Sequence, residues 1–572
     1  QNILCITYSL CRNGKSEYCK KNREFYFKPT ITGQMKRLIK TISFLVVLIP
    51  LFLSDPLSAD QNKSSTHTLQ LLITSDMHGG FTNQVMYPHR KKSGLFHIAN
   101  YIKQIRLAQK NVILLDTGDI ISGSPLSIYY NYLYPTRLAE NPFFRLLNSL
   151  KYDAIVPGNH DLEHLSLLEN FYIPGGKTKW IAANIQQSGI PFFSPYLSIH
   201  QPNFKIVIIG ATTPGILIWS NISTLATTRI TSVKQALIKW IAKIKKEIEP
   251  DFLILAIHGG LNPMRDDENG KLNRIPPVND IRSLLPDFPE IDFIISGHDH
   301  QLYPYRSNQK LRYIDQRPVV SAGKHAETVT NIKLSLQKKG NTWKIINHQV
   351  NIFKAADSNQ NKPPMTSFSQ DYLTFINEPF NWKVHKASTT IAASCINELL
   401  ALSFSDQKTA GSLFPSIEKI SLYKVKNQIL RRKHIYQWLR YPNHAVSIKM
   451  SHNDIFLATH PKPEFGKRRS AYNRRLFSYF KTEWNNTLNK QSWWPNRKDY
   501  KKNKTVKISD YHFYGGGGVL SAIFLKQKGE ANITGKIFQE QLIDYLKSNQ
   551  QLEPESCQFL KYQSVTSAVS PK

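Results

Sequence analysis

Short apolar runs alternate with stretches of helical spacing between residue 69 and about residue 336. The apolar runs cover residues 69–74, 111–115, 154–156, 205–209, 252–257 and 293–295. Between them, residues 93–108 and 232–249 repeat apolar positions with the spacing of an amphipathic helix. Continuous apolar strands that alternate with helices are typical of sheets covered on both faces. The pattern predicts a layered α/β domain over residues 68–340.

The pattern changes after this region. Residues 337–364 are polar and rich in Lys, Asn and Gln, and we expect a linker at 341–364. Residues 365–565 mix aromatic, polar and glycine-rich stretches, with helical spacing at 537–546. We therefore expect a smaller α+β domain to follow the first one.

The N-terminal part contains a pattern typical of an export signal. A basic pair follows Met35, an apolar run covers residues 42–53, and Ala59 provides a small side chain for cleavage. The pattern predicts a signal peptide at 35–59 and a periplasmic or secreted protein. An uncleaved membrane anchor is the alternative, which the shortness of the apolar run disfavours. Because Met35 stands directly before the basic pair, we expect it to be the start residue and residues 1–34 to be a non-native segment.

The composition is that of a globular protein with a strong basic excess. Of 572 residues, 41% are hydrophobic and 20% are charged, which excludes a chain that is disordered throughout. The formal net charge of +33 favours contact with phosphorylated substrates or other anions, or it reflects a basic surface without a dedicated partner. No long basic run stands out, and we expect no specific nucleic-acid partner. Cys395 and Cys557 follow the signal and either form a disulfide or remain as free thiols.

Several of the apolar runs end in a polar cluster. The clusters carry Asp76 and His78, Asp116 and Asp119, Asn159 and His160, His258, and finally His298, Asp299 and His300. Ligands bind beyond the carboxyl ends of strands in open α/β sheets, so these side chains are expected to converge. A single histidine after a strand is usually a loop residue, but carboxylates and imidazoles are costly to gather without a partner. The repeated clusters therefore predict one shared site.

The mix of side chains predicts the kind of ligand. Imidazole, carboxylate and one amide, without a thiolate, suit divalent ions such as Mn, Zn, Fe or Co. The donors are more numerous than one tetrahedral ion needs, so two divalent ions are expected. Pairs of such ions clamp the attacking and leaving oxygens during phosphoryl transfer. The sequence therefore predicts a two-metal hydrolase of phosphate esters.

The ordered motifs Asp-x-His, Gly-Asp, Gly-Asn-His-Asp, His-Gly and Gly-His-Asp-His resemble those of the calcineurin-like metallophosphoesterases. The stretch at 118–125 is similar to the 5′-nucleotidase and 2′,3′-cyclic-nucleotide 2′-phosphodiesterase branch of that family. The resemblance covers about residues 69–336 and implies a layered β-sandwich flanked by helices. It also implies a smaller C-terminal domain that selects the nucleotide.

The resemblance assigns a role to each candidate residue. One metal ion would be held by Asp76, His78, Asp119 and His300, and the other by Asp119, Asn159, His258 and His298. A metal-bound hydroxide would attack phosphorus, while His160 stabilises the transition state and assists the leaving oxygen. Glu163 stands where many relatives have Asp or Asn and would orient the His160 imidazole. Asp116 and Asp299 are expected to support the ligands or the fold rather than to bind metal, and His325 to serve a loop.

The C-terminal region carries a fainter resemblance to the nucleotide-specificity domain of the same family. Tyr441 and Asn443 lie in a segment similar to the one that presents the first base-stacking aromatic, and Tyr511 and Gly516 in one similar to the second. Stacking between the two tyrosines would stabilise a bound base by about 1–3 kcal/mol per ring. The glycines would let the backbone approach the sugar closely. The alternative is that both tyrosines are ordinary packing residues.

The sequence leaves three functions open. The leading hypothesis is an exported hydrolase of nucleotides, either a 5′-nucleotidase or a 2′,3′-cyclic-nucleotide 2′-phosphodiesterase/3′-nucleotidase. A hydrolase of nucleotide-sugar pyrophosphates is a related alternative. A non-catalytic protein that binds nucleotides or anionic surfaces is the third, but it predicts the loss of some metal ligand, and every position of the motifs is present. We expect a small nucleotide as partner and no stable membrane span once the signal is removed.

Overall fold

The described part of the chain begins with strand β1 (Thr66–Thr74). The computed structural model describes residues 66–82, 92–165, 168, 178–219, 228–261, 279–304, 310–361, 363–405, 409–415, 428–451, 476–480, 504–509, 532–552 and 554–563. The signal peptide expected at 35–59 lies outside these residues, as do Tyr511 and Gly516. Within these ranges, no helix has the length and the hydropathy that a membrane span requires.

In the described residues the first sheet has six strands, in the order β16-β15-β1-β2-β3-β4. Besides β1, they are β2 (Val112–Asp116), β3 (Ala154–Ile155), β4 (Lys179–Trp180), β15 (Thr328–Lys339) and β16 (Thr342–Lys354). Strands β1 to β4 run parallel, and β1 pairs with β15 in the antiparallel sense. The parallel strands therefore end at the same edge of the sheet.

The second sheet has seven strands among the described residues, in the order β12-β14-β11-β10-β8-β7 with β13 paired to β14. They are β7 (Tyr196–Gln201), β8 (Phe204–Thr212), β10 (Phe252–His258), β11 (Phe293–Ser296), β12 (Leu302–Tyr303), β13 (Arg312–Ile314) and β14 (Arg317–Ala322). Strands β8, β10, β11 and β14 run parallel. A small sheet of β5 (Ile185–Gln187), β6 (Ile190–Pro191) and β9 (Thr228–Ile230) accompanies them.

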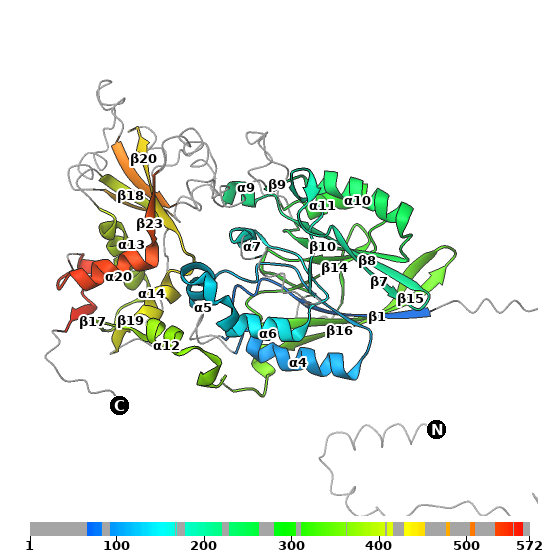
Figure 1. Cartoon of the computed structure of the whole chain (residues 1–572), viewed down its shortest axis with the longest axis horizontal. Helices are drawn as coiled ribbons and strands as arrows, with labels where there is room; N and C mark the ends of the chain where they lie inside the picture. Colours follow the sequence, from blue (N-terminus) through cyan, green and yellow to red (C-terminus); the bar gives the residue numbers. More distant parts are fainter. Residues whose placement is uncertain are drawn as a thin grey trace, which may run out of the picture. The chain divides into compact units, whose positions relative to one another are not determined.

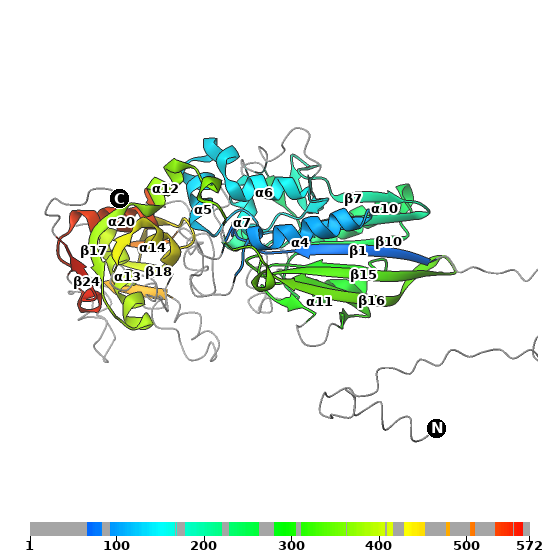
Figure 2. The ribbon, with the colours of Figure 1, turned by 90° about the horizontal axis from the view of Figure 1, so that it is seen from below.

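Successive side chains along a strand point to opposite faces, and this alternation builds the layers. In β1, Leu71 packs in the core between the two sheets, whereas Leu72 packs with α4 (Leu95–Ala108). In β8, Ile208 belongs to the core between the sheets, whereas Ile209 packs with α10 (Val233–Glu247). Figure 1 shows α4 and α10 on opposite sides of the strands, and Figure 2 shows α4 lying along β1. The result is a β-sandwich flanked by helices.

Two further helices complete the outer layers. Helix α6 (Pro142–Leu150) shares the core of α4, and α11 (Ile281–Leu284) shares the core of α10. Helix α6 begins where the side chain of Asn141 accepts a hydrogen bond from the Phe143 amide at 3.0 Å. Such an N-cap stabilises a helix by about 1 kcal/mol.

The described residues of the C-terminal part form two smaller sheets, in the orders β19-β17-β24 and β21-β18-β22-β20-β23. Their strands are β17 (Pro379–Val384), β18 (Thr409–Pro415), β19 (Ile429–Arg431), β20 (His444–Met450), β21 (Leu476–Phe480), β22 (Lys504–Ser509), β23 (Asn532–Ile537) and β24 (Leu560–Tyr562). The helices include α12 (Gln370–Asn377), α13 (Thr389–Ser403), α14 (Arg432–Trp438) and α20 (Phe538–Ser548). A disulfide between Cys395 and Cys557 joins α13 to the short 3-10 helix Glu555–Cys557.

The predicted elements are confirmed in the N-terminal part, where every apolar run overlaps a strand and both predicted helices form. The predicted linker at 341–364 is wrong for residues 342–354, which form β16. In this strand Trp343 and Val350 are buried and most other side chains face solvent. A strand with one covered face at the edge of a sheet has a polar composition, which explains the misassignment.

The disulfide generates a stability prediction. It joins cysteines 162 residues apart, and closing so long a loop contributes about 2–5 kcal/mol by restricting the unfolded chain. We expect a Cys395→Ser variant to unfold at a lower urea concentration than the wild type. In a reducing agent the two proteins should unfold alike. Equal unfolding midpoints without reductant would contradict the cross-link.

Candidate metal centre

The carboxyl ends of parallel strands from both sheets meet at one edge. Asp76 and His78 follow β1, Asp119 follows β2, Asn159 follows β3, His258 ends β10, and His298 and His300 follow β11. Backbone hydrogen bonds join the loops: the amide of Asp76 donates to the Gly118 carbonyl at 2.8 Å, and that of His78 to the Asp119 carbonyl at 2.7 Å. The structure therefore brings together side chains that are more than two hundred positions apart in the sequence.

These loops hold several residues in the left-handed backbone region. The φ angle is 49° at Asp76, 50° at His78, 55° at Asp119, 78° at His298 and 58° at His300. Residues with a Cβ rarely adopt this conformation, which costs on the order of 1–3 kcal/mol at each position. Such strain persists where the surroundings fix the backbone, and it concentrates at functional sites.

Asp76, His78 and His300 form one candidate metal-binding group, with donor atoms that all lie within 4.8 Å of one another. The Nε2 atoms of His78 and His300 are 3.0 Å apart, and His300 Nε2 lies 3.6 Å from Asp76 Oδ1. The Ser75 hydroxyl and the His298 amide both donate to the Asp76 carboxylate. These hydrogen bonds orient the carboxylate toward the group.

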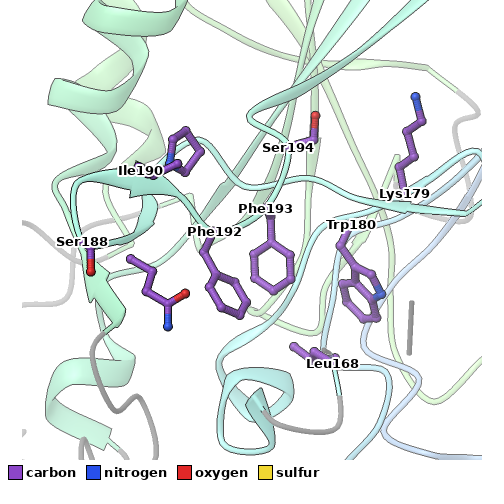
Figure 3. A pocket seen from close by; sticks show the side chains of 10 residues that line it. Leu168, Lys179, Trp180, Ser188, Ile190, Phe192, Phe193 and Ser194 are labelled. Atoms are coloured by element: carbon purple, nitrogen blue, oxygen red, sulfur yellow. The ribbon is translucent and has the colours of Figure 1, made fainter. Parts of the chain in front are cut away.

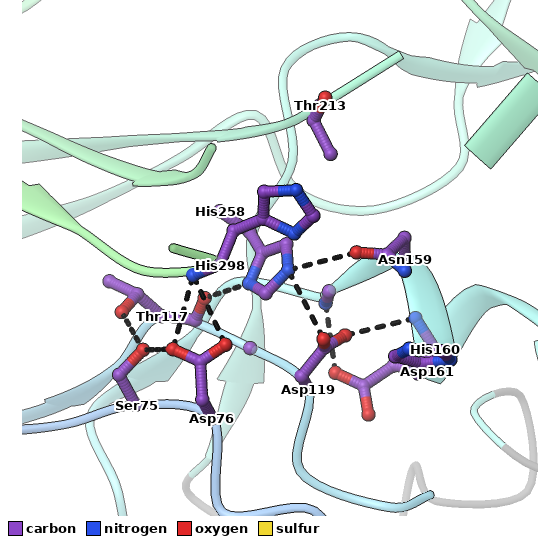
Figure 4. A network of polar contacts seen from close by, with 12 residues as sticks. Ser75, Asp76, Thr117, Asp119, Asn159, His160, Asp161, Thr213, His258 and His298 are labelled. Atoms are coloured by element: carbon purple, nitrogen blue, oxygen red, sulfur yellow. Dashed lines mark hydrogen bonds and ion pairs between the residues drawn. The ribbon is translucent and has the colours of Figure 1, made fainter. Parts of the chain in front are cut away.

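Asp119, His258 and His298 form a second candidate group (Figure 4). Asp119 Oδ2 lies 3.4 Å from His258 Nε2 and 3.9 Å from His78 Nε2, so this carboxylate stands between the two groups. Asn159 Oδ1 lies 3.1 Å from His258 Nε2. All of the metal ligands predicted from the sequence are thus gathered at one place.

The donor atoms fit divalent cations. His78 Nδ1 donates to the Ser122 carbonyl at 3.0 Å and His258 Nδ1 to the Thr117 carbonyl at 2.6 Å, which directs each Nε2 into the site, where it can bind a metal ion in place of a proton. Burial lowers the pKa of His78 to about 3, so this imidazole is neutral. Burial raises the pKa of Asp76 to about 8, and a carboxylate in such surroundings needs a positive partner to stay ionised. Imidazole, carboxylate and amide donors match Mn, Zn, Fe and Co.

His160 lies beside these groups on the short helix α7 (Asn159–Leu162). Its amide donates to Asp119 Oδ1 at 2.9 Å, and its Nδ1 is 3.2 Å from Glu163 Oε2. Burial opposes protonation, but the negative charges of Glu163 and Asp119 outweigh it and raise the pKa of His160 to about 10. The imidazole is therefore held as a cation next to the candidate ligands.

Tyr441 comes from the C-terminal part and stacks on His160. The ring centroids are 4.8 Å apart and the planes differ by 13°. The Tyr441 ring also meets the edge of His78, with 6.3 Å between centroids. Its carbonyl accepts a hydrogen bond from the Asn443 amide at 2.8 Å. One of the two predicted base-stacking aromatics therefore lies at the candidate metal centre.

Asp161 joins the loops after β2 and β3, although the sequence analysis gives it no role. Its Oδ1 accepts hydrogen bonds from the amides of Ile120 at 2.8 Å and Ile121 at 2.9 Å, and its Oδ2 accepts one from Gly158 at 2.8 Å. A signal was present in the sequence, because an acid at the start of a helix readily accepts backbone hydrogen bonds.

His325 was expected to serve a loop, but it is buried at the candidate metal centre. Its ring centroid lies 5.4 Å from that of His78 and 5.9 Å from that of His300, and its amide donates to the Asp76 carbonyl at 2.7 Å. Strand β14 runs parallel to β11, so its carboxyl end reaches the same edge. Polar residues beyond the carboxyl ends of parallel strands were predicted to converge, and His325 follows this rule as well.

A separate cavity of about 760 Å³ has an aromatic lining. Trp180, Phe192 and Phe193 line it together with Ile190 and Lys179 (Figure 3). None of the candidate metal ligands belongs to its lining. The metal centre and this cavity are therefore distinct features of the described residues.

Residues 69–302 match the calcineurin-like phosphoesterase family. Together with the sandwich and the gathered donors, this match identifies the region as a calcineurin-like phosphoesterase domain. The resemblance inferred from the motifs is confirmed, and so is the predicted fold class.

Curated relatives of this domain act on nucleotides according to their names. The trifunctional nucleotide phosphoesterase protein YfkN of Bacillus subtilis is 25% identical over 335 residues, which cover 54% of this chain and 22% of that protein. The 2′,3′-cyclic-nucleotide 2′-phosphodiesterase/3′-nucleotidase of Yersinia enterocolitica is 25% identical over 328 residues, which cover 53% of this chain and 48% of that protein. The chain thus spans less than half the length of these relatives.

A solved structure extends the likeness to the C-terminal part. The crystal structure of a candidate 5′-nucleotidase from Staphylococcus aureus superposes with a TM-score of 0.64 at 16% identity, covering 84% of this chain and 97% of that one. At this identity the likeness concerns the fold alone. The substrate has to be argued from the residues of the site.

Gly158 generates a prediction about the metal centre, because no side chain fits at this position. An added Cβ would overlap the carboxylate and the amide of Asp119. We expect Gly158→Ala to displace Asp119 and to weaken divalent-metal binding roughly 10–100-fold, as measured by metal analysis after equilibrium dialysis. Gly535→Ala is the matched control, since nothing lies within 4 Å of a Cβ added there. Equal metal binding by both variants would contradict the assignment.

Proposed function

We propose that the protein is an exported hydrolase of nucleotide phosphate esters that uses two divalent metal ions. The observation that carries the proposal is the Asp119 carboxylate between two candidate metal-binding groups. A shared carboxylate suits a pair of ions of the kind that clamps a phosphoryl group. The curated relatives named as nucleotide phosphoesterases support the substrate class.

The candidate donors divide into two sets around Asp119. One ion would be held by Asp76, His78 and His300, the other by Asn159, His258 and His298, and Asp119 would be shared. The bound ions would supply positive charge to the phosphoryl oxygens and activation of the attacking water. Backbone hydrogen bonds join the loops that carry these residues and would keep the donor atoms in place.

His160 would protonate the leaving oxygen. The Glu163 carboxylate beside Nδ1 raises the pKa of His160 and favours the protonated ring, and its contact with Nδ1 directs the Nε2 proton toward the site. When the P–O bond breaks, the leaving oxygen takes the electron pair of that bond. Transfer of the Nε2 proton neutralises this oxygen, which is general acid catalysis.

Tyr441 supports a nucleoside as the leaving group. The Tyr441 ring lies on His160. A leaving group whose oxygen is protonated by His160 would therefore be next to an aromatic surface. Aromatic rings bind bases of any sequence by stacking. We propose Tyr441 and Asn443 as contacts to the nucleoside, with Tyr511 and Gly516 as further contacts.

The remaining parts of the chain have roles that fit this activity. We propose that residues 365–565 select the nucleotide. Residues 35–59 would be the signal peptide that directs the protein to the periplasm or out of the cell. The disulfide between Cys395 and Cys557 supports export, because disulfides persist in oxidising compartments.

The first test compares the wild type with Asp119→Ala on a panel of 5′-, 3′- and 2′,3′-cyclic nucleotides and nucleotide sugars. We expect a loss in kcat/KM of more than about 100-fold, because removing a group that merely supports a metal ligand already costs 10–100-fold. A chelator should abolish the wild-type rate, and added metal should restore it. Equal rates for both proteins would rule out the proposed activity, and a preference for nucleotide sugars would favour the pyrophosphate alternative.

The second test concerns the nucleoside contact. Tyr441→Ala should raise KM for nucleotides roughly 5- to 100-fold, which corresponds to about 1–3 kcal/mol of stacking, with little change for an aryl phosphate of small leaving group. Steady-state kinetics on the two substrates measures the difference. The same increase for both substrates would show that Tyr441 does not contact the base.

A further inference from the structure

Gln539 is a buried amide that binds the turn carrying Tyr441. It is the second residue of α20, and its side chain is completely buried. Its Nε2 donates to the Leu439 carbonyl at 2.8 Å and to the Tyr441 carbonyl at 2.9 Å. A single amide therefore holds the backbone on both sides of Arg440 and limits the directions in which the Tyr441 side chain can point.

Backbone hydrogen bonds hold the same turn at its end. The Asn443 amide donates to the Tyr441 carbonyl, and the Phe538 amide donates to the Asn443 carbonyl, both at 2.8 Å. The next residue, His444, is hydrogen-bonded through Nε2 to the Tyr132 hydroxyl of the N-terminal part. The start of α20 thus provides a rigid base for the turn, and Gln539 is its side-chain contact to the Tyr441 carbonyl.

The burial of Gln539 is costly unless these two bonds are made. Removing an amide from water costs on the order of 1–3 kcal/mol when its hydrogen bonds are not replaced. The Oε1 atom of Gln539 is buried without a hydrogen-bond partner among the described residues. The two hydrogen bonds from Nε2 to the turn therefore offset the free-energy cost of burying the amide. An apolar side chain could be buried at this position without making any hydrogen bond.

We propose that Gln539 is a positioning residue for substrate selection. It fixes the turn at 439–441 so that the Tyr441 ring stays on His160, within reach of a nucleoside leaving group. The near-parallel stack of the two rings, 4.8 Å apart, depends on this fixed turn. The inference rests on the proposed function, because it assigns Gln539 an effect on nucleotides that acts through Tyr441.

The test begins with Gln539→Leu, which removes both donors and keeps a similar volume. We expect KM for nucleotides to rise about 2- to 10-fold, the equivalent of a net hydrogen-bond contribution. The kcat value and the KM for an aryl phosphate should stay within about twofold. Gln539→Glu, which keeps the shape but has no N–H donor, should show at least the same increase. Gln541→Leu is the matched control, because Gln541 of the same helix donates to the Ser403 carbonyl and not to the turn.

A double-mutant cycle decides whether Gln539 acts through Tyr441. In the Tyr441→Ala background, Gln539→Leu should raise nucleotide KM no further. Independent, multiplying effects would overturn the inference, and so would a Gln539→Leu variant that behaves like Gln541→Leu. The same cycle on melting temperature needs no activity: non-additive shifts are expected, and additive shifts would overturn the inference. A wild type that hydrolyses no nucleotide refutes the proposed function, and the thermal cycle still decides the inference about the turn.

Discussion

The carboxylate of Asp119 is the contact on which the rest of the site depends. One of its oxygens accepts the His160 amide, and the other lies between the two groups of imidazoles. Burial would raise the pKa of Asp119, but the charges of His258 and His160 hold it well below its usual range. Two supports keep this carboxylate in place: Gly158 has no side chain to displace it, and Asp161 joins the neighbouring loops. The backbone of His160 and both candidate metal-binding groups therefore depend on the same carboxylate.

Much of the sandwich could be predicted because its signals are local. The run at 252–257 is apolar on every residue, as a strand buried on both faces requires, and it became β10. The candidate ligands are equally local, since each follows such a run. Strand β16 could not be recognised in this way, because only one of its faces is covered and its sequence is mostly polar. His325 was underrated because a single histidine after a strand is usually a loop residue, and the sequence does not show that its ring is buried beside His78.

Contacts between distant parts of the chain could not be predicted from any local pattern in the sequence. Gln539 is a polar residue in an amphipathic helix, and such residues usually face solvent. Its burial follows from the packing of α20 against a turn about a hundred positions earlier. The stack of Tyr441 on His160 likewise joins two parts of the chain that the sequence pattern assigns to different domains. The proposed substrate selection rests on such contacts, so the domain was easier to identify than its substrate.

Strand β16 has a consequence for the behaviour of the protein in solution. Among the described residues it pairs with β15 alone, so one side of a long strand presents backbone groups to its surroundings. An open edge of this kind is a template for a strand of another molecule and a common start of aggregation. Lys344 and Lys354 place positive charge on this edge, and the basic excess of the chain makes copies repel one another. The positive charge thus opposes pairing between the edge strands of two copies, in addition to any attraction that it exerts on phosphorylated molecules.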